Sequence, residues 1–151
     1  MFSIDIINFT KRRVPLQTLS KAASFAARHW RLQGELSLVL GGDKRLRSLN
    51  CDFRAKDKST DVLSFSAPAM SAGVLGEIFI NLDDCRRPSK YREVFSFSPS
   101  ADYLLIFLML HGLLHLAGYN DDTESERLAM IARGDKMMKE LVKNAIIKAK
   151  L

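Results

Sequence analysis

The sequence has few cysteines, no long hydrophobic run and no leader, and each of these scarcities removes a class of protein. Its 151 residues include two cysteines, Cys51 and Cys85. They are too few for a disulfide framework and lack the paired spacing of a thiolate zinc site. We expect both to be reduced and buried as small apolar residues in a cytosolic protein. The longest apolar run, Tyr103 to Leu110, is far shorter than the roughly 20 residues that a membrane helix needs.

The N-terminal segment MFSIDIINFTKRR has no basic stretch before its apolar residues and no small-residue cleavage site, unlike a signal peptide. We therefore expect a soluble, cytoplasmic protein with no membrane contact. Hydrophobic residues make up 47% of the chain and charged residues 26%, which excludes wholesale disorder. This length predicts a single domain over residues 1–151. The net charge of +6 favours a polyanionic partner.

Hydropathy patterns predict an α+β protein. Alternation of apolar and polar residues predicts strands over residues 2–6, 36–40, 61–65 and 75–80. Apolar residues three and four apart predict helices over residues 15–31, 43–53, 101–117 and 124–150. This order implies a mixed sheet of about four strands packed with helices on at least one face. The polar segment 82–99 is expected to be a surface loop or a poorly formed helix.

Several residues mark the ends of these helices. Asp43 is expected to cap the second helix, and Ser98 or Ser100 the third. The third helix is apolar nearly all round, which predicts that it is the buried central helix. Gly118 suits a left-handed cap at its end. Thr123 and Glu126 form a capping box for the last helix, in which Gly134 is a candidate weak point.

The end of the central helix carries the most informative pattern. His111 and His115 are four residues apart, which places both imidazoles on one face of a helix. A turn at Gly118 would then bring a carboxylate back toward them, with Asp121 as the natural third ligand and Asp122 as the alternative. Two imidazoles, one carboxylate and an open position are typical of a catalytic zinc site. The competing interpretation is a pair of core histidines that donate to backbone carbonyls.

The residue after the first histidine separates two kinds of metal enzyme. The spacing His-x-x-x-His-x-x-Gly-x-x-Asp is that of an extended metalloprotease motif, in which a glutamate follows the first histidine and acts as general base. Here that residue is Gly112, which can neither accept a proton nor orient a water molecule. The pattern therefore predicts metal binding without the base of a peptidase.

A second informative segment lies before the third strand. Arg54, Lys56 and Lys58 place three cations within five residues. The segment is either a solvated charged loop or a clamp for phosphate groups, which a guanidinium can hold bidentately. Glu77, on the fourth strand, is a weaker candidate for orienting groups in the cleft.

Three blocks together resemble the YbeY family of bacterial rRNA-maturation endoribonucleases. They are FRAKDKSTDVLSF over residues 53–65, GEI over residues 76–78 and HGLLHLAGY over residues 111–119. The resemblance implies a zincin-like α+β fold and one divalent metal ion per chain, with zinc the expected ion. It implies His111, His115 and position 121 as ligands and Arg54 as the catalytic arginine. Lys56 and Lys58 are expected to bind substrate.

The sequence departs from the family pattern at three positions. Asp121 stands where the family usually has a third histidine, Asn120 where it has an aspartate, and Ser59 where it has a proline. An aspartate can ligate zinc, but it makes the site less positive by one charge. An oxygen ligand also makes manganese or magnesium more plausible than a third imidazole would.

The function that the resemblance implies is cleavage of single-stranded RNA. It would serve maturation of the 3′ end of small-subunit rRNA and ribosome quality control, with ribosomal subunits or assembly proteins as partners. A second hypothesis is an RNA- or ribosome-binding protein without catalysis, whose metal site is structural or lost. A third is a metallopeptidase on the same scaffold.

Overall fold

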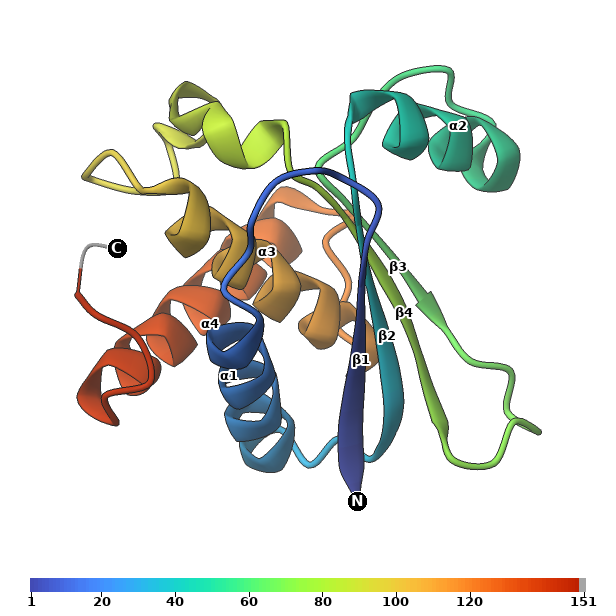
Figure 1. Cartoon of the computed structure of the whole chain (residues 1–151), viewed down its shortest axis with the longest axis horizontal. Helices are drawn as coiled ribbons and strands as arrows, with labels where there is room; N and C mark the ends of the chain where they lie inside the picture. Colours follow the sequence, from blue (N-terminus) through green and yellow to red (C-terminus); the bar gives the residue numbers. More distant parts are fainter. Residues whose placement is uncertain (150–151) are drawn as a thin grey trace.

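The computed structural model describes residues 1–149, in which one sheet packs against a layer of helices (Figure 1). The strands are β1 (Phe2–Asn8), β2 (Gly34–Gly41), β3 (Val62–Ser66) and β4 (Val74–Asn81). The helices are α1 (Leu16–His29), α2 (Asp43–Arg54), α3 (Ala101–Leu116) and α4 (Glu124–Lys143). Two short 3₁₀ helices, η1 (Asp84–Arg86) and η2 (Pro88–Tyr91), follow β4. None of the helices within residues 1–149 is long and apolar enough to cross a membrane.

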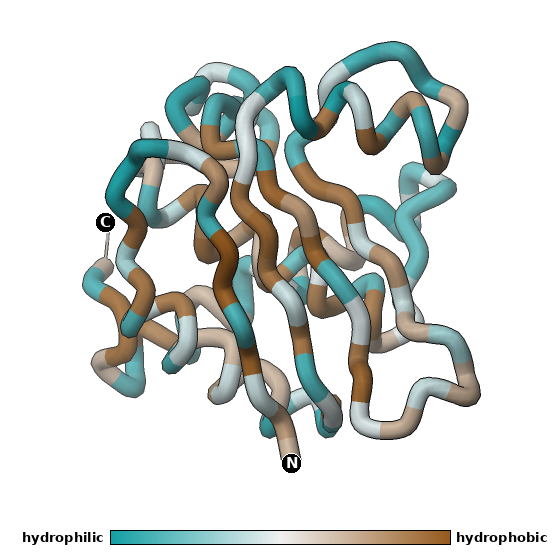
Figure 2. The backbone as a smooth tube through the Cα atoms, turned by 45° about the vertical axis from the view of Figure 1, so that its right-hand side comes forward, coloured by the Kyte–Doolittle hydropathy of each residue, from teal (hydrophilic) through white to brown (hydrophobic). Residues whose placement is uncertain are grey.

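The sheet is mixed, as the order of the elements predicts. Its strand order is β1-β2-β4-β3, in which β1, β2 and β4 are parallel and β3 is antiparallel to β4 at one edge. Helices α1, α3 and α4 lie on one side of the sheet, and α2 lies beyond the carboxyl end of β2 (Figure 1). The opposite side of the sheet faces solvent, and Figure 2 shows the strands there in front of the helices. The α+β prediction is confirmed.

Helix α3 is the buried centre of the helical layer. Most of its residues are inaccessible to solvent, including Leu104, Ile106, Met109 and Leu110, each 0% exposed. Such a helix has no polar face, because every side of it contacts protein. It begins at Ser100, whose hydroxyl accepts a hydrogen bond from the Tyr103 backbone N–H at 3.1 Å.

The segment 82–99 was expected to be a surface loop or a poorly formed helix. It holds two short 3₁₀ helices, but the expected position at the surface is wrong. Leu82, Cys85, Tyr91 and Phe95 are buried in the core. The Phe95 ring packs edge-on against Phe107 of α3, with ring centroids 4.9 Å apart. Sequence periodicity missed these residues because 3₁₀ turns are too short to show one.

Several predicted boundaries also differ. Gly42, not Asp43, is the N-cap of α2, and the Asp83 carboxylate accepts the Asp43 N–H at 2.8 Å. Helix α4 has the predicted capping box but ends at Lys143 rather than near Lys150, which lies outside the described residues. Cys85 is buried as expected, whereas Cys51 is exposed on α2.

Candidate metal centre

The end of α3 folds the chain back on itself through a defined turn. Gly118 has a φ of +102°, in the left-handed region that glycine adopts without steric cost. Its N–H donates to the His115 carbonyl at 3.0 Å, and the Tyr119 N–H donates to the Leu114 carbonyl at 3.1 Å. These two bonds form a Schellman motif. The turn directs the following residues back toward the histidines of the last helical turns.

The structure brings His111, His115 and Asp121 together. One Asp121 oxygen, Oδ2, lies 3.2 Å from His111 Nε2 and 3.3 Å from His115 Nε2. Each residue offers one ligand atom to a group whose atoms all lie within 4.8 Å of one another. Asp122, the alternative third ligand, is exposed and does not belong to this group.

These distances suit a small divalent ion. Zinc binds nitrogen and oxygen ligands at about 2.0–2.2 Å, so the ligands of a tetrahedral site are roughly 3.3–3.5 Å apart. The two measured nitrogen–oxygen separations, 3.2 and 3.3 Å, are close to that spacing. Three protein ligands also leave one position for water or substrate, which is the arrangement of a catalytic site.

Hydrogen bonding prepares the histidines for this role. The Tyr119 carbonyl lies 3.1 Å from His115 Nδ1, and because a carbonyl only accepts, Nδ1 must carry the proton. The lone pair of His115 is then on Nε2, the atom that faces Asp121. Burial, with the nearby His115, lowers the pKa of His111, which favours the neutral imidazole that metals bind.

Close packing at Gly112 holds the histidines against the sheet. A side chain on Gly112 would place its first carbon 2.8 Å from Ile78 Cγ2 of β4 and 3.0 Å from Ser64 Oγ of β3. Real Cβ atoms are rarely found this close to other heavy atoms, so Ile78 and Ser64 would have to move to make room for a side chain. The glycine therefore brings α3 close to β3 and β4, next to His111. The same lack of space excludes a glutamate in the position of a peptidase base unless the helix shifts.

The predicted basic residues lie at the end of α2 and in the segment that follows it. Arg54 is the last residue of α2, where Ala55 ends the helix at a φ of +55°. Arg54, Lys56 and Lys58 are all exposed. Within residues 1–149, none of the recorded ion pairs uses them. Their segment leads into β3, the strand that contacts α3 at Gly112.

Two buried asparagines anchor this basic segment, and sequence reasoning did not single them out. Asn50 Nδ2 donates to the Lys58 carbonyl at 2.9 Å, and Asn81 Nδ2 donates to Ser59 Oγ at 3.1 Å. Asn50 is 2% exposed and Asn81 is 0% exposed. A single asparagine within a polar stretch gives no sequence signal of such a role. Together they fix the path between α2 and β3.

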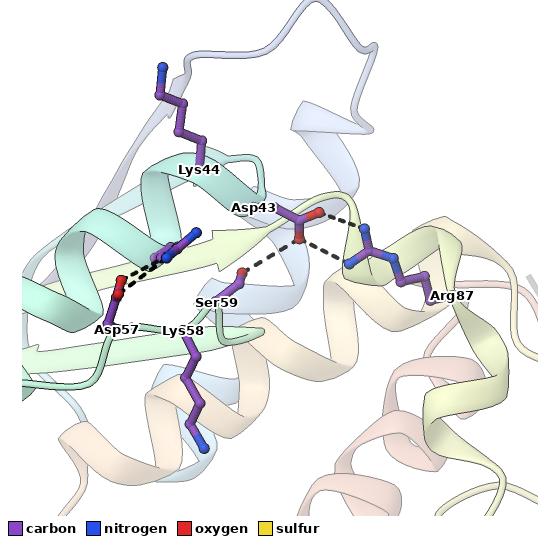
Figure 3. A pocket seen from close by; sticks show the side chains of 7 residues that line it. Asp43, Lys44, Asp57, Lys58, Ser59 and Arg87 are labelled. Atoms are coloured by element: carbon purple, nitrogen blue, oxygen red, sulfur yellow. Dashed lines mark hydrogen bonds and ion pairs between the residues drawn. The ribbon is translucent and has the colours of Figure 1, made fainter.

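Lys58 lies on the rim of a surface depression of about 630 Å³. Lys44 and Lys58 extend from its rim in different directions, while Arg87 binds Asp43 (Figure 3). Arg87 and Asn81 hold the pKa of the Asp43 carboxyl well below its usual range. Glu77 points away from the site, since its neighbour Ile78 contacts α3 and successive strand residues face opposite sides.

Comparison with known proteins yields one family. The family model described as Endoribonuclease YbeY matches residues 6–142. A relative of that name from Nautilia profundicola is 38% identical over 107 residues, which cover 71% of this chain and 72% of the relative. Another from Solibacter usitatus is 36% identical over 139 residues, or 88% of each chain.

A solved structure shows the same fold. The solution structure of a Thermotoga maritima protein superposes with a TM-score of 0.59 at 24% identity. The match covers 97% of this chain and 96% of that one. At this identity the likeness concerns the arrangement of the elements alone.

Proposed function

The chain belongs to the YbeY family of endoribonucleases, and we propose that it is a metal-dependent endoribonuclease that hydrolyses single-stranded RNA. The observation that carries this proposal is the convergence of three ligand atoms at the end of α3, with Asp121 Oδ2 within 3.3 Å of both imidazoles. His111, His115 and Asp121 would hold one divalent ion, with zinc the expected ion. Such an ion polarises a phosphoryl oxygen and acidifies water.

The protein groups have distinct parts in this proposal. The Tyr119 carbonyl keeps the proton of His115 on Nδ1, so that Nε2 is free to bind. Arg54 stabilises the negative charge that develops on the phosphoryl oxygens, because its guanidinium presents several donors in one plane. Lys56 and Lys58 bind the phosphates of the RNA on either side of the cut.

Asp121 changes the site relative to the family's usual third histidine. A carboxylate lowers the net charge of the loaded site by one, so bound water becomes a weaker acid than with three imidazoles. The hard oxygen ligand also widens the choice of ion toward manganese and magnesium. We therefore expect activity to be sustained by more than one divalent ion.

We further propose that the substrate is ribosomal RNA. Maturation of the 3′ end of the small-subunit rRNA and ribosome quality control are the roles that family membership suggests. Ribosomal subunits or assembly proteins would then be the partners, in the cytoplasm. The alternative without catalysis is an RNA- or ribosome-binding protein, which Asp121 favours if it has weakened the metal site. Packing at Gly112 disfavours a peptidase, since a glutamate base has no room there.

The first test is the metal content of the purified protein. We expect near-stoichiometric metal by elemental analysis in the wild type, prepared without chelators, and a sharp fall in Asp121→Ala. Asp122→Ala is the matched control, because it removes the neighbouring carboxylate that lies outside the group. Wild-type protein that holds no metal, even after zinc is added, would contradict the catalytic proposal and favour the binding protein.

The second test is cleavage of a single-stranded RNA by Arg54→Ala. Loss of cleavage is expected while metal content and the unfolding midpoint stay at the wild-type values. Arg28→Ala, an exposed arginine in the last turn of α1, is the control for loss of surface charge. Wild-type cleavage rates in Arg54→Ala would exclude the role assigned to that residue.

A further inference from the structure

A run of contacts leads from the metal centre to a second pocket on the surface. Tyr119, whose carbonyl faces His115, has a ring that is 36% exposed. The Arg133 guanidinium carbon lies over that ring, 4.4 Å from its centroid. Arg133 also lines a pocket of about 390 Å³ between the end of α1 and the middle of α4. Two side-chain contacts therefore connect the ligand His115 with this pocket.

The pocket combines an aromatic surface with unpaired cations. Its lining residues are His29, Trp30, Arg133, Lys136, Met137 and Glu140. Those from α4 are three, four and seven residues from Arg133, so they share one face of the helix. Trp30, the one tryptophan of the sequence, is half-buried there. We call this site the Trp30 pocket.

The cations of the Trp30 pocket are free to bind an anion. The ion pairs of α4 within residues 1–149 join Arg127 to Glu124 and Lys139 to Asp135. Neither pair uses Arg133 or Lys136, and both of these side chains are exposed. The depression near Lys58 differs from this site, because its arginines are occupied by carboxylates and no aromatic residue lines it.

We propose that the surface from Tyr119 through Arg133 to the Trp30 pocket is a subsite for a single-stranded nucleotide segment, which rests on the proposed endoribonuclease function. Bases stack on the accessible parts of the Trp30 and Tyr119 rings, and phosphates pair with Arg133 and Lys136, the combination by which proteins hold single strands without reading sequence. Glu140 offers an acceptor for the exocyclic amino group of a base. The pocket volume lies within the range of small-molecule sites.

The position of this subsite gives it a part in the reaction. A strand cut at the metal centre would extend past His115, and Tyr119 and Arg133 connect that point with the Trp30 pocket. Binding several nucleotides beyond the cut would raise affinity for RNA strands over short fragments. We therefore expect shortened substrates to lose affinity more than they lose chemical rate.

Trp30 supplies a direct test that does not depend on cleavage. The full chain, kept in EDTA so that RNA is not cut, is titrated with a ten-nucleotide oligocytidylate, whose bases carry the amino group, while tryptophan fluorescence is recorded. We expect the fluorescence to be quenched, with a midpoint equal to the dissociation constant from anisotropy of a labelled strand. Fluorescence that does not change at saturating RNA would overturn the proposal.

Variants then separate this subsite from general attraction to RNA. Arg133→Ala and Lys136→Ala should each raise the dissociation constant about threefold and reduce the salt slope by about 0.7, the value for one phosphate contact on a single strand. Lys143→Ala is the matched control, since it removes an exposed lysine two turns along the same helix, outside the pocket. Equal losses in all three variants would overturn the proposal.

Two further results distinguish this proposal from the proposed function. Quenching of Trp30 without cleavage under any metal condition would support the subsite and contradict the nuclease. Cleavage of RNA with no response from Trp30 would support the nuclease and overturn the subsite. Equal quenching by inorganic polyphosphate, which has no bases, would assign the pocket to anions in general and would also overturn a nucleotide subsite.

Discussion

Gly112 and Gly134 show how two glycines inside helices differ in what surrounds them. Substituting either by alanine adds helix propensity worth about 1 kcal/mol. At Gly112 the added carbon meets the branched Ile78 of the sheet at 2.8 Å, whereas at Gly134 it meets the edge of the Phe107 ring at 3.1 Å. A ring edge in a helix layer can move by a few tenths of an ångström more easily than a residue in a central strand.

We predict that Gly112→Ala lowers the free energy of unfolding by about 1–3 kcal/mol, the usual cost of overpacking. Gly134→Ala, the matched control, should stay within about 1 kcal/mol of the wild type because propensity offsets the milder contact. Urea unfolding followed by Trp30 fluorescence measures both. Equal midpoints for the two variants would show that α3 does not need the close approach to β3 and β4.

At the residue scale, the sequence predicted the positions of side chains correctly where the geometry of one helix determines them. The four-residue spacing of His111 and His115 is sufficient to place both on one helical face. The sequence also favoured Asp121 over Asp122 as the third ligand, and the path of the chain after Gly118 brings Asp121 beside the histidines. The hydrogen bond from Asn50 to the Lys58 carbonyl could not be predicted from the sequence, since a buried amide has no periodic pattern.

At the scale of elements, the turn after α3 determines whether the carboxylate reaches the histidines. Gly118 has a φ of +102° and Gly73, in the loop before β4, has a φ of +77°. A side chain at either position would contact nothing within 4 Å. Alanine therefore meets the same left-handed strain at both, about 1–2 kcal/mol, and no clash at either.

We predict that Gly118→Ala weakens metal binding at least tenfold, because relaxation of the strained turn displaces Asp121 from the histidines. Gly73→Ala should lose similar stability and bind metal as the wild type does. Competition with a chromogenic chelator gives both affinities, and thermal unfolding without metal gives both stabilities. Wild-type metal affinity in Gly118→Ala would mean that the Schellman turn does not position Asp121.

The strands and helices were predicted most accurately where the hydropathy pattern kept the same period over many residues. The strands and the four α-helices follow the predicted order, since each has a clear two-residue or 3.6-residue pattern. The surface position expected for segment 82–99 was wrong, because its buried residues come from short 3₁₀ turns that have no periodic pattern. The end of α4 was also wrong, since apolar and basic residues continue beyond Lys143 without a break in composition.

At the scale of the whole molecule, charge is unevenly placed on the two sides of the sheet. The chain has a net charge of +6, yet the solvent-facing side of the sheet carries Asp5, Glu35 and Glu77, all exposed. Register places Asp5 and Glu77 on either side of Ser37, on three neighbouring strands. The basic segment that contains Lys56 and Lys58 follows α2. Net charge alone therefore does not indicate which surface of the protein binds RNA.

We predict that RNA affinity depends on where charges lie and not on their sum. Lys56→Ala with Lys58→Ala should raise the dissociation constant about tenfold and reduce the salt slope by about 1.4, for two phosphate contacts on a single strand. Asp5→Asn with Glu35→Gln removes as many charges of the opposite sign, but on β1 and β2, the two strands farther from β3 in the sheet. Because salt screens exposed charges beyond about 8 Å at physiological ionic strength, this second pair should change affinity less than twofold. Anisotropy titrations at several salt concentrations measure both pairs, and a gain in affinity in the acidic pair that mirrors the loss in the basic pair would show that net charge governs binding.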